Sequence, residues 1–560
     1  MKVKIETRIV SSLEKVFCSP DCCGERISCL SALKGERVSF QVAVKASLPS
    51  VLTFTVDKGT FGGELLVREV VNIPTLLPAI PEDDYVLRKE AGLFPDALKP
   101  VTGGIAISPN NWHALWVTMI IPESHPAGVF SVGFHLNVVS RYAHSVWGTD
   151  EDVAETEERF DLKVVDAVLP EQKLKVTHWF HADCIQHHHK VPAWSEGHWA
   201  MLEKYFRNFT AHGSNMLLTP LWSLPLDILP GVTRRPDCQL LKIDYDGKEW
   251  AFDFSRLERW IDTAKKCGIK NFEMVHAFSQ WGLKNPPEIL VTKNGKEERM
   301  FGTTMPSTAP EYADFLRALT AKLLPFLRAH GLTPDNCYFH ISDEPPESAL
   351  ENYTYASKLY RGLLGDYPVI DALSSVQFFK RGLIDRPVPV ELHLDEFIQE
   401  KVAERWVYYA GCWQDGVPGR MFGMPSLRNR VLGVLLYVYD CAGFLEWGYN
   451  FWFSVFNFTQ EIDPWQDSNS GRSFHSGGAY LVYPDSDGPV DSLRHEVIAE
   501  GFEDERALRL LESKTSREEV LALLDEVTGY RISIRKYPRD EKWLLSLREK
   551  VNEKLGALSR

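Results

Sequence analysis

Two adjacent carboxylates, Asp343 and Glu344, stand at the end of an apolar segment that starts at Cys337, and two prolines follow them directly. Proline cannot donate to a β-ladder and suits the first turn of a helix, so the segment is typical of a strand that ends at the carboxylate pair. In an α/β barrel the carboxyl end of a strand carries the reacting groups. The pattern alone leaves a second interpretation open, in which the pair only lies near a helix amino terminus, where the macrodipole favours negative charge.

A second acidic pair, Asp395-Glu396, provides an internal comparison. It runs straight into Phe397-Ile-Gln-Glu-Lys-Val, which has the composition of a helix start. Here we expect Asp395 to cap the helix and Glu396 to lie in its first turn.

Several histidines suggest a metal site. His178 and His181 flank the end of one expected strand, and His276 and His340 end two others. The histidine run 187–189 is a poor ligand set, because consecutive side chains point in divergent directions. The sequence contains no His-Glu-x-x-His motif, nucleophile elbow, phosphate-binding loop or dinucleotide fingerprint. We therefore expect neither a metal nor another cofactor, and assign these histidines to substrate hydrogen bonding or core packing.

Tryptophans give a third signal. Six of the 16 lie at or just after expected strand ends, on the face where a ligand would bind. Flat aromatic faces pack against the apolar C–H faces of sugar rings, while Asp, Asn, Gln and His satisfy the hydroxyls. The six are Trp179, Trp222, Trp281, Trp413, Trp447 and Trp452.

The amino-terminal part of the chain is expected to be a β-domain. Residues 1–168 contain short alternating or apolar segments, such as Val38–Lys45 and Ala114–Ile121, and turn residues such as Gly62-Gly63 separate them. This spacing predicts an antiparallel β-sandwich.

Residues 169–460 alternate strand-like and amphipathic helix-length segments, which predicts parallel strands with helical crossovers. Eight candidate strands fit a (β/α)₈ TIM-type barrel better than an open sheet. The expected strands are Leu174–Phe180, Met216–Leu218, Phe272–His276, Cys337–Ile341, Val369–Leu373, Val388–Leu392, Trp406–Ala410 and Gly443–Trp447. The expected helices are His198–Phe209, Ser255–Cys267, Ala309–His330, Pro346–Leu364 and Pro425–Tyr439.

The remaining segments complete a multidomain fold of α/β plus β class. The longest connections, 222–250 and 278–305, follow the second and third strands, where a barrel keeps its binding loops. Residues 461–560 contain three acidic-basic segments of helical length, which predict a carboxyl-terminal extension, mostly helical, packed on the barrel. They are Asp491–Ser513, Arg517–Thr528 and Asp540–Leu555.

Charge and hydropathy exclude several partners. With 62 Lys and Arg against 76 Asp and Glu, the net charge is −14, so no basic field attracts nucleic acid or an anionic membrane. The first residues lack the apolar core of a secretory signal, and the apolar stretch Val431–Tyr439 is far shorter than the ~20 residues that span a bilayer. We expect a cytoplasmic protein whose clustered Cys18, Cys22, Cys23 and Cys29 are free thiols rather than a zinc site.

Four motifs, together with Gly443–Asn450 and Leu481–Pro484 with Gly501–Asp504, carry a resemblance to a known family. The motifs are Trp179-Phe-His-Ala-Asp-Cys184, Leu217-Leu-Thr-Pro-Leu221 with Pro225-Leu-Asp227, His276-Ala-Phe-Ser-Gln-Trp-Gly282 and Tyr338-Phe-His-Ile-Ser-Asp-Glu-Pro345. In this order and spacing they resemble glycoside hydrolase family 123 and its uncharacterised bacterial relatives. The resemblance implies a β-sandwich joined to a (β/α)₈ barrel and the activity of a retaining β-N-acetylgalactosaminidase.

The resemblance also implies roles for the carboxylate pair. The 2-acetamido oxygen of the sugar attacks its own anomeric carbon, so the protein supplies no carboxylate nucleophile. Glu344 would protonate the leaving oxygen and later deprotonate water. Asp343 would accept the acetamido N–H and stabilise the positive charge of the oxazolinium intermediate. An ionised Asp343 also helps to keep its neighbour protonated.

Motif membership and strand-end position select the candidate substrate contacts. Trp281 and Trp447 are the preferred walls for the sugar ring, and loop organisation is an equal alternative for Asp227 and Gln239. The full set is His181, Asp183, Asn215, Asp227, Gln239, His276, Gln280, Trp281, Tyr408, Trp447 and Asn450.

Two positions depart from the family pattern. Glu446 stands where relatives more often carry an aromatic or apolar residue, and could tune the leaving-group side or face outward. Ala479 replaces a small polar residue or glycine before the Leu481-Val-Tyr-Pro motif. These departures put the exact sugar in doubt rather than the reaction class.

The leading hypothesis is an exo-acting hydrolase that removes terminal β-linked N-acetylgalactosamine from a small glycan. A β-N-acetylglucosaminidase or another glycosidase of this fold is one alternative, and a non-catalytic carbohydrate-binding protein is another. A metal-dependent hydrolase that uses His178, His181 and His276 is a third. The expected partner is a glycan with a terminal N-acetylhexosamine, and a homodimer remains open.

Overall fold

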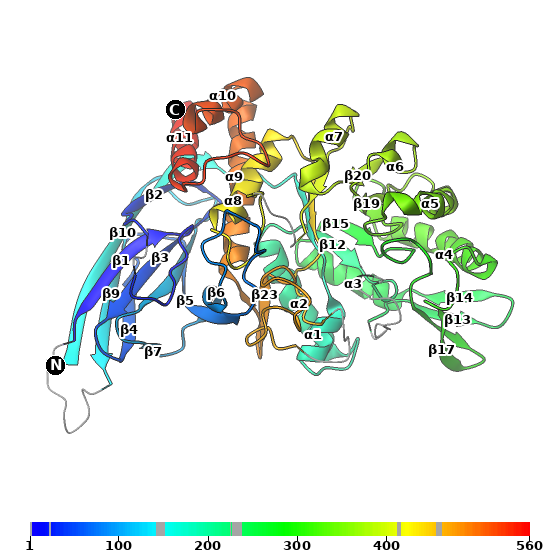
Figure 1. Ribbon diagram of the computed structural model, residues 1–560, viewed down its shortest axis with the longest axis horizontal. Coiled ribbons are helices and arrows are strands. Elements are labelled where there is room, and N and C mark those ends of the chain that lie inside the picture. Colours follow the sequence, from blue (N-terminus) through cyan, green and yellow to red (C-terminus); the bar gives the residue numbers. More distant parts are fainter. Residues whose placement is uncertain are drawn as a thin grey trace.

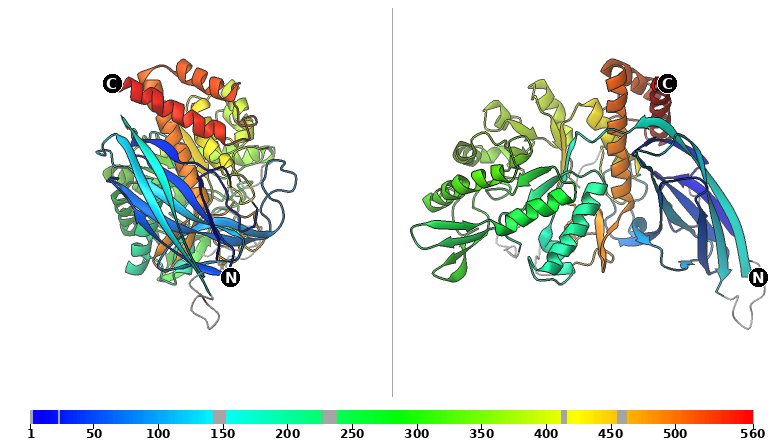
Figure 2. Two further views of the ribbon diagram at one scale, coloured as in Figure 1. Left: turned by 90° about the vertical axis from the view of Figure 1, so that its left-hand side faces the viewer. Right: turned by 180° about the vertical axis from the view of Figure 1, so that it is seen from behind.

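The computed structural model describes residues 3–21, 24–141, 152–224, 226, 238–410, 416–454 and 462–559. The molecule is elongated, with a β-sandwich at one end, a β/α region at the other, and helix α9 (Leu493–Lys514) standing between them (Figures 1 and 2). No helix in the described part of the chain is both long enough and apolar enough to cross a bilayer.

The sandwich consists of two five-stranded sheets. Alternating side chains from both sheets meet in one core, where the rings of Phe40 and Phe160 stack with centroids 3.9 Å apart. The pairings are antiparallel as predicted, except that β10 pairs with β2 in parallel. One sheet has the order β1 (Ile5–Ser11), β3 (Arg37–Ala46), β8 (Trp112–Ile120), β5 (Glu64–Thr75) and β6 (Gly92–Pro100). The other has the order β2 (Cys29–Lys34), β10 (Val153–Val168), β9 (Gly128–Ser140), β4 (Ser50–Asp57) and β7 (Ile105–Ile107).

The β/α region contains parallel strands at each of the eight predicted places, alternating with helices (Figure 1). The sixth strand lies earlier than predicted, because it ends at Val388 and residues Glu391–His393 form a 3₁₀ turn. The strands are β11 (Lys175–His178), β12 (Met216–Thr219), β15 (Asn271–Met274), β18 (Cys337–Phe339), β19 (Ile370–Ala372), β20 (Arg386–Val388), β21 (Trp406–Tyr408) and β22 (Gly443–Glu446). The helices are α1 (Ala182–His188), α2 (Glu196–Ala211), α3 (Ser255–Lys266), α4 (Pro310–Ala329), α5 (Leu350–Leu364), α6 (Gln377–Lys380), α7 (Leu394–Gln399) and α8 (Leu427–Val438).

Continuous ladders join these strands in three groups, β11-β22-β21, β12-β15-β18 and β19-β20. Single parallel bridges connect Phe339 with Val369 and Val390 with Tyr408. The ladders therefore make arcs of a barrel rather than one continuous eight-stranded sheet.

The two long connections after β12 and β15 fold together into a sheet that the sequence analysis does not predict. Its order is β14 (Trp250–Asp253), β13 (Lys242–Tyr245), β16 (Ile289–Lys293) and β17 (Lys296–Phe301). The β16–β17 hairpin turns at Asn294-Gly295, where both residues have positive φ, as a two-residue type I′ turn requires.

The carboxyl-terminal part is mostly helical as predicted, but it contacts both ends of the molecule. Helix α9 crosses α8 where Gly433 meets Gly501, and a Cβ at Gly433 would lie 1.7 Å from the Gly501 carbonyl oxygen. The segment also contains the hairpin β23 (Val482–Asp485) and β24 (Gly488–Asp491), helix α10 (Arg517–Thr528) and helix α11 (Lys542–Leu558), which packs on β10 and β2 of the sandwich. The extension therefore lies between the sandwich and the β/α region and contacts both, whereas we predicted that it packs on the barrel alone.

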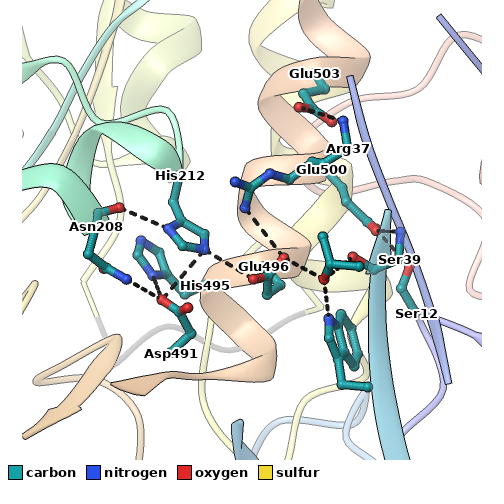
Figure 3. A network of polar contacts seen from close by, with 12 residues as sticks. Ser12, Arg37, Ser39, Asn208, His212, Asp491, His495, Glu496, Glu500 and Glu503 are labelled. Carbon is teal, nitrogen blue, oxygen red and sulfur yellow. Dashed lines mark hydrogen bonds and ion pairs between the residues drawn. The ribbon is translucent and has the colours of Figure 1, made fainter. Parts of the chain in front are cut away.

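Buried carboxylates of α9 contact both the sandwich and the β/α region (Figure 3). The Glu496 carboxylate pairs with Nη1 of Arg37 in the sandwich at 3.4 Å. It also pairs with Nε2 of His212, which follows α2, at 3.2 Å. One turn further on, Glu500 accepts a hydrogen bond from the Ser12 hydroxyl at 2.7 Å. Breaking such a buried, hydrogen-bonded pair is costly, so the sandwich, α9 and the β/α region are held together by these contacts.

Candidate active site

The predicted carboxylate pair follows β18 after the short segment 340–342, before the next helix begins. The first turn of η2 (Glu347–Ala349) contains Glu347, and the first turn of α5 contains Glu351, so Asp343 and Glu344 are not the acidic residues of either helix start. Glu344 has a positive φ of 43°, which costs about 1–3 kcal/mol for a residue with a side chain. Its N–H donates to the carbonyl of Ala372 at 2.9 Å, which helps to hold this conformation. The interpretation as helix-terminal charges is therefore not supported.

Three predicted residues converge on the two carboxylates. Gln280 donates from Nε2 to Oδ2 of Asp343 at 2.6 Å. The hydroxyl of Tyr408 donates to Oε1 of Glu344 at 2.6 Å, and the indole N–H of Trp281 donates to Oε2 at 3.3 Å. Burial and the adjacent carboxylate raise the pKa of Tyr408 well above 10, so the phenol remains a donor. Asp343 is buried, whereas Trp281 is 42% exposed.

A buried polar layer fixes the backbone that leads into the pair. The Asp371 carboxylate of β19 accepts the N–H groups of Ile341 and Ser342 at 2.9 and 3.4 Å, and the Tyr353 hydroxyl at 2.6 Å. It also receives Nδ1 of His340 at 3.3 Å. Asp371 therefore holds the two peptides immediately before Asp343.

His340 continues this layer across the strands. Its Nε2 donates to Glu273 of β15 at 2.8 Å, and Glu273 also accepts from Thr177 and from the indole of Trp179. Burial disfavours the imidazolium, but the hydrogen bonds to Asp371 and Glu273 outweigh it and raise the pKa of His340 to about 9. The layer therefore contains a buried cation between two carboxylates.

His276 lies in this layer rather than on an open surface. Its fully buried ring stacks on His340 with centroids 4.3 Å apart. Burial, with the neighbouring His340, holds the pKa of His276 well below its usual value, so its imidazole is neutral.

The contacts predicted after β11 and β22 lie together. Asn450 clamps the His181 backbone, accepting its N–H at 2.8 Å and donating to its carbonyl at 3.0 Å. Nε2 of His181 donates to the Trp447 carbonyl at 3.2 Å. Asp183 is buried in the first turn of α1. The amide of Asn450 thus acts on the loop backbone, while the partly exposed Trp447 ring packs on Phe474 with centroids 4.7 Å apart.

Two further predicted contacts hold backbone groups of other segments. Asn215 lies just before β12, at the amino-terminal end of the strands, where Oδ1 accepts the Val176 N–H at 2.9 Å and Nδ2 donates to the Leu174 carbonyl at 2.9 Å. Gln239 donates from Nε2 to two backbone carbonyls and accepts the Leu290 N–H at 3.0 Å. Asn215 supports the β11–β12 junction. Gln239 organises the loop sheet, which agrees with the alternative interpretation given for it. Asp227 lies outside the described residues.

The aromatic surface is smaller than predicted. Trp179, Trp222 and Trp452 are buried core residues, and Trp413 lies outside the described residues. Trp281 and Trp447, the two preferred walls, are the accessible members among the described tryptophans of the set.

Glu446 does not face outward, which was one of the two expectations for it. It is fully buried, with Oε2 2.5 Å from Nη2 of Arg420 and accepting the Gly448 N–H at 2.8 Å. Its carboxylate is therefore a structural partner of Arg420 at the end of β22.

The predicted metal alternative is not supported by the placement of its histidines. Among the described residues, His178, His181 and His276 do not form a common ligand group. His178 contacts the Ser214 hydroxyl at 2.9 Å, and His181 and His276 have the contacts given above. Of the clustered cysteines, Cys18 and Cys29 are free thiols, whereas Cys22 and Cys23 lie outside the described residues.

A cavity beside Glu344 is lined largely by residues that were not predicted from the sequence. It measures about 520 Å³, and its walls come from the loops after β18, β19 and β20 together with Tyr408. Glu396 is among the lining residues although it lies in the first turn of α7, as predicted; His393 rather than Asp395 is the residue before that helix. The position of Glu396 after the sixth strand is the signal that could have identified it, because loops at the carboxyl ends of the strands line the active sites of barrels.

Parallel strands with helical crossovers, and paired carboxylates contacted by an amide, an indole and a phenol, are features that suit a glycoside hydrolase. The model of the glycoside hydrolase 123 catalytic domain matches residues 179–511. The chain belongs to glycoside hydrolase family 123. The match runs past residue 460 and so includes β23, β24 and most of α9.

One solved structure shares this fold closely. A family 123 glycoside hydrolase from Clostridium perfringens, described for glycolipid glycan hydrolysis, aligns with a TM-score of 0.74 at 14% identity, over 100% of this chain and 99% of that one. A β-glucuronidase from Parabacteroides merdae aligns with a TM-score of 0.30 at 12% identity, over 87% of this chain and 50% of that one. No curated protein matches the chain.

Proposed function

We propose that this family 123 enzyme removes terminal β-linked N-acetylgalactosamine with retention of configuration, through an oxazolinium intermediate formed by the substrate itself. The observation that carries the proposal is the placement of Asp343 and Glu344 after β18, each with its own hydrogen-bond donor. Two neighbouring carboxylates with different surroundings suit two different tasks.

In the first step, the acetamido oxygen attacks the anomeric carbon while the bond to the leaving oxygen breaks. The Glu344 carboxyl transfers its proton to that oxygen. Asp343, buried and held by Gln280, accepts the acetamido N–H and stabilises the positive charge that develops on the ring.

In the second step, water attacks the anomeric carbon and gives its proton to Glu344, which opens the oxazolinium ring. Tyr408 and Trp281 donate to the two oxygens of Glu344, and this arrangement suits the carboxylate form that accepts the proton. Trp281 and Trp447 provide walls for the sugar ring, and His181 and Asp183 are proposed contacts for its hydroxyls.

We also propose that the three arcs close as one (β/α)₈ barrel at residues 169–460, between a sandwich at 1–168 and an extension at 461–560. The bridges at Phe339 and Val390 support this, as does the hydrogen bond from the Asn215 N–H to the Val176 carbonyl at 3.0 Å between β12 and β11. A crystal structure in which β11 and β12 separate would contradict closure.

Chromogenic β-glycosides test the function directly. We expect turnover of the β-N-acetylgalactosaminide, slower or no turnover of the β-N-acetylglucosaminide, and none of the unacetylated β-galactoside. Activity should be unchanged by a chelator. Equal turnover of the β-galactoside would refute the acetamido mechanism, and saturable sugar binding without product would indicate a carbohydrate-binding protein instead.

A further inference from the structure

The cavity beside Glu344 lies on one side of the carboxylate pair. Its walls include Glu347 after β18, Ser375 after β19, Glu396 after β20 and Tyr408 of β21. Asp343, although described, does not line it, and neither do Gln280 and Trp281, which contact the carboxylate pair. The cavity therefore extends from Glu344 away from Asp343.

This asymmetry identifies the part of the substrate that the cavity would hold. Under the proposed function, Asp343 faces the acetamido group of the sugar that is removed, and Glu344 faces the oxygen that departs with the remainder of the glycan. A cavity that touches Glu344 but not Asp343 lies on the departing side. Its volume of about 520 Å³ is within the ~300–1,000 Å³ of ligand pockets, so it can hold more than a small alcohol.

The charges around the cavity restrict what can bind there. Glu347 and Glu396 line it together with Glu344, and no Lys or Arg is among its described lining residues. The ring of His393 contacts Glu396, with Nδ1 and Oε1 2.7 Å apart, and the Ser375 hydroxyl donates to Glu347 at 3.1 Å. Carboxylates and hydroxyls of this kind bind sugar hydroxyls, whereas a sulfate, uronate or sialic acid carboxylate would meet like charge.

We propose, on the basis of the proposed function, that this cavity is the site of the leaving sugar, and that Glu347 and Glu396 select a neutral, hydroxyl-bearing residue over an anionic one. The two glutamates are specificity-determining residues. They contact the departing part of the substrate and do not take part in bond breaking.

A matched pair of aryl glycosides tests the inference. The 3-carboxamidophenyl and 3-carboxyphenyl β-N-acetylgalactosaminides differ mainly in one negative charge on the leaving side. For the wild-type enzyme we expect kcat/KM for the carboxamide to exceed that for the carboxylate by about tenfold or more, because like charges face each other in the cavity. The ratio should fall as salt is added, since partly exposed charges are screened.

Charge-removing variants assign the effect to the lining residues. E347Q and E396Q should each lower the ratio, and the double variant should bring it close to one. E351Q is the matched control, because Glu351 is an exposed glutamate of the adjacent helix α5 that does not line the cavity, and it should leave the ratio unchanged.

The outcomes separate the inference from the function on which it rests. If both glycosides are cleaved with a ratio near one, or if the double variant retains the wild-type ratio, the selection by Glu347 and Glu396 is refuted while the function stands. If neither glycoside is cleaved, the proposed function is refuted, and the inference falls with it.

Discussion

Replacing Asp371 with Asn should separate positioning from chemistry, because Asp371 contacts the backbone before the carboxylates but neither carboxylate itself. The Asp371 carboxylate accepts from two peptide N–H groups, the Tyr353 hydroxyl and His340. The change replaces this anion with a neutral amide, whose own N–H groups face these donors. Hydrogen bonds to charged groups contribute about 1.5–3 kcal/mol each, and removing one partner of a buried ion pair costs about 3–5 kcal/mol. We therefore expect the free energy of unfolding to fall by about 3–5 kcal/mol.

The kinetic effect should be specific to kcat. A displacement of the peptides before Asp343 moves both carboxylates relative to the bound sugar, and a 1 Å misplacement can cost about 10²-fold in rate. We expect Asp371→Asn to lower kcat by about that factor with little change in KM, as measured by steady-state kinetics beside urea unfolding curves.

Tyr353→Phe is the matched control for this variant. It removes one donor to Asp371 and leaves the two peptide contacts, so it should cost about 1–2 kcal/mol of stability and leave kcat within a few-fold. If Asp371→Asn is destabilised as expected but retains wild-type kcat, Asp371 is only a structural residue and the positioning argument is wrong.

Three further changes test separate parts of the structure. Tyr408→Phe removes a hydrogen bond to Glu344 and should lower kcat/KM by about 10- to 100-fold, with a smaller loss on a substrate with a good leaving group; an unchanged kcat/KM on both would contradict it. Because its carboxylate partners raise the pKa of His340 from 6.5 to about 9, its contribution to stability is fully present below pH 6.5 and is lost as pH rises through 9. That shift corresponds to roughly 3 kcal/mol, so unfolding curves of the wild type, but not of His340→Gln, should show the loss. Burial alone would raise the pKa of Glu496, but Arg68, which contacts it at 2.7 Å, together with Arg37 and His212 outweighs burial and holds the pKa well below the ordinary value. This stabilisation is therefore present above pH 4.5 and is lost on acidification, so Glu496→Gln should be less stable than the wild type at pH 7 and should approach it in acid.

The sequence alone located the carboxylate pair near the end of a strand, because an apolar segment, two carboxylates and two prolines mark where a strand stops. It also selected Gln280, Trp281 and Tyr408, since each lies near the carboxyl end of an expected strand or just after it, and the carboxyl ends of parallel strands meet at one edge. The roles of the two carboxylates came from the family resemblance and not from the spacing.

Other predictions failed for identifiable reasons. Asn215 belongs to a motif, but it precedes its strand, and motif membership does not distinguish the two ends. Three tryptophans near strand ends turned inward to fill the core, because side-chain direction depends on packing that a linear pattern does not contain. Glu396 was correctly placed at a helix start, and that interpretation concealed its place in the cavity wall. The loop sheet was missed although Asn294-Gly295 is a strong hairpin signal.

The most direct test of the central claim is the rate of the wild-type enzyme on aryl β-N-acylgalactosaminides that share one leaving group and carry zero to three fluorines on the acyl methyl. Fluorine withdraws electrons from the acyl oxygen, which is the nucleophile in the proposed mechanism. We predict that kcat/KM falls steeply with each fluorine, because the oxygen becomes a weaker nucleophile while the protein groups are unchanged. A kcat/KM that does not depend on fluorination would show that the acyl oxygen does not attack, and would contradict the assignment of Asp343 and Glu344.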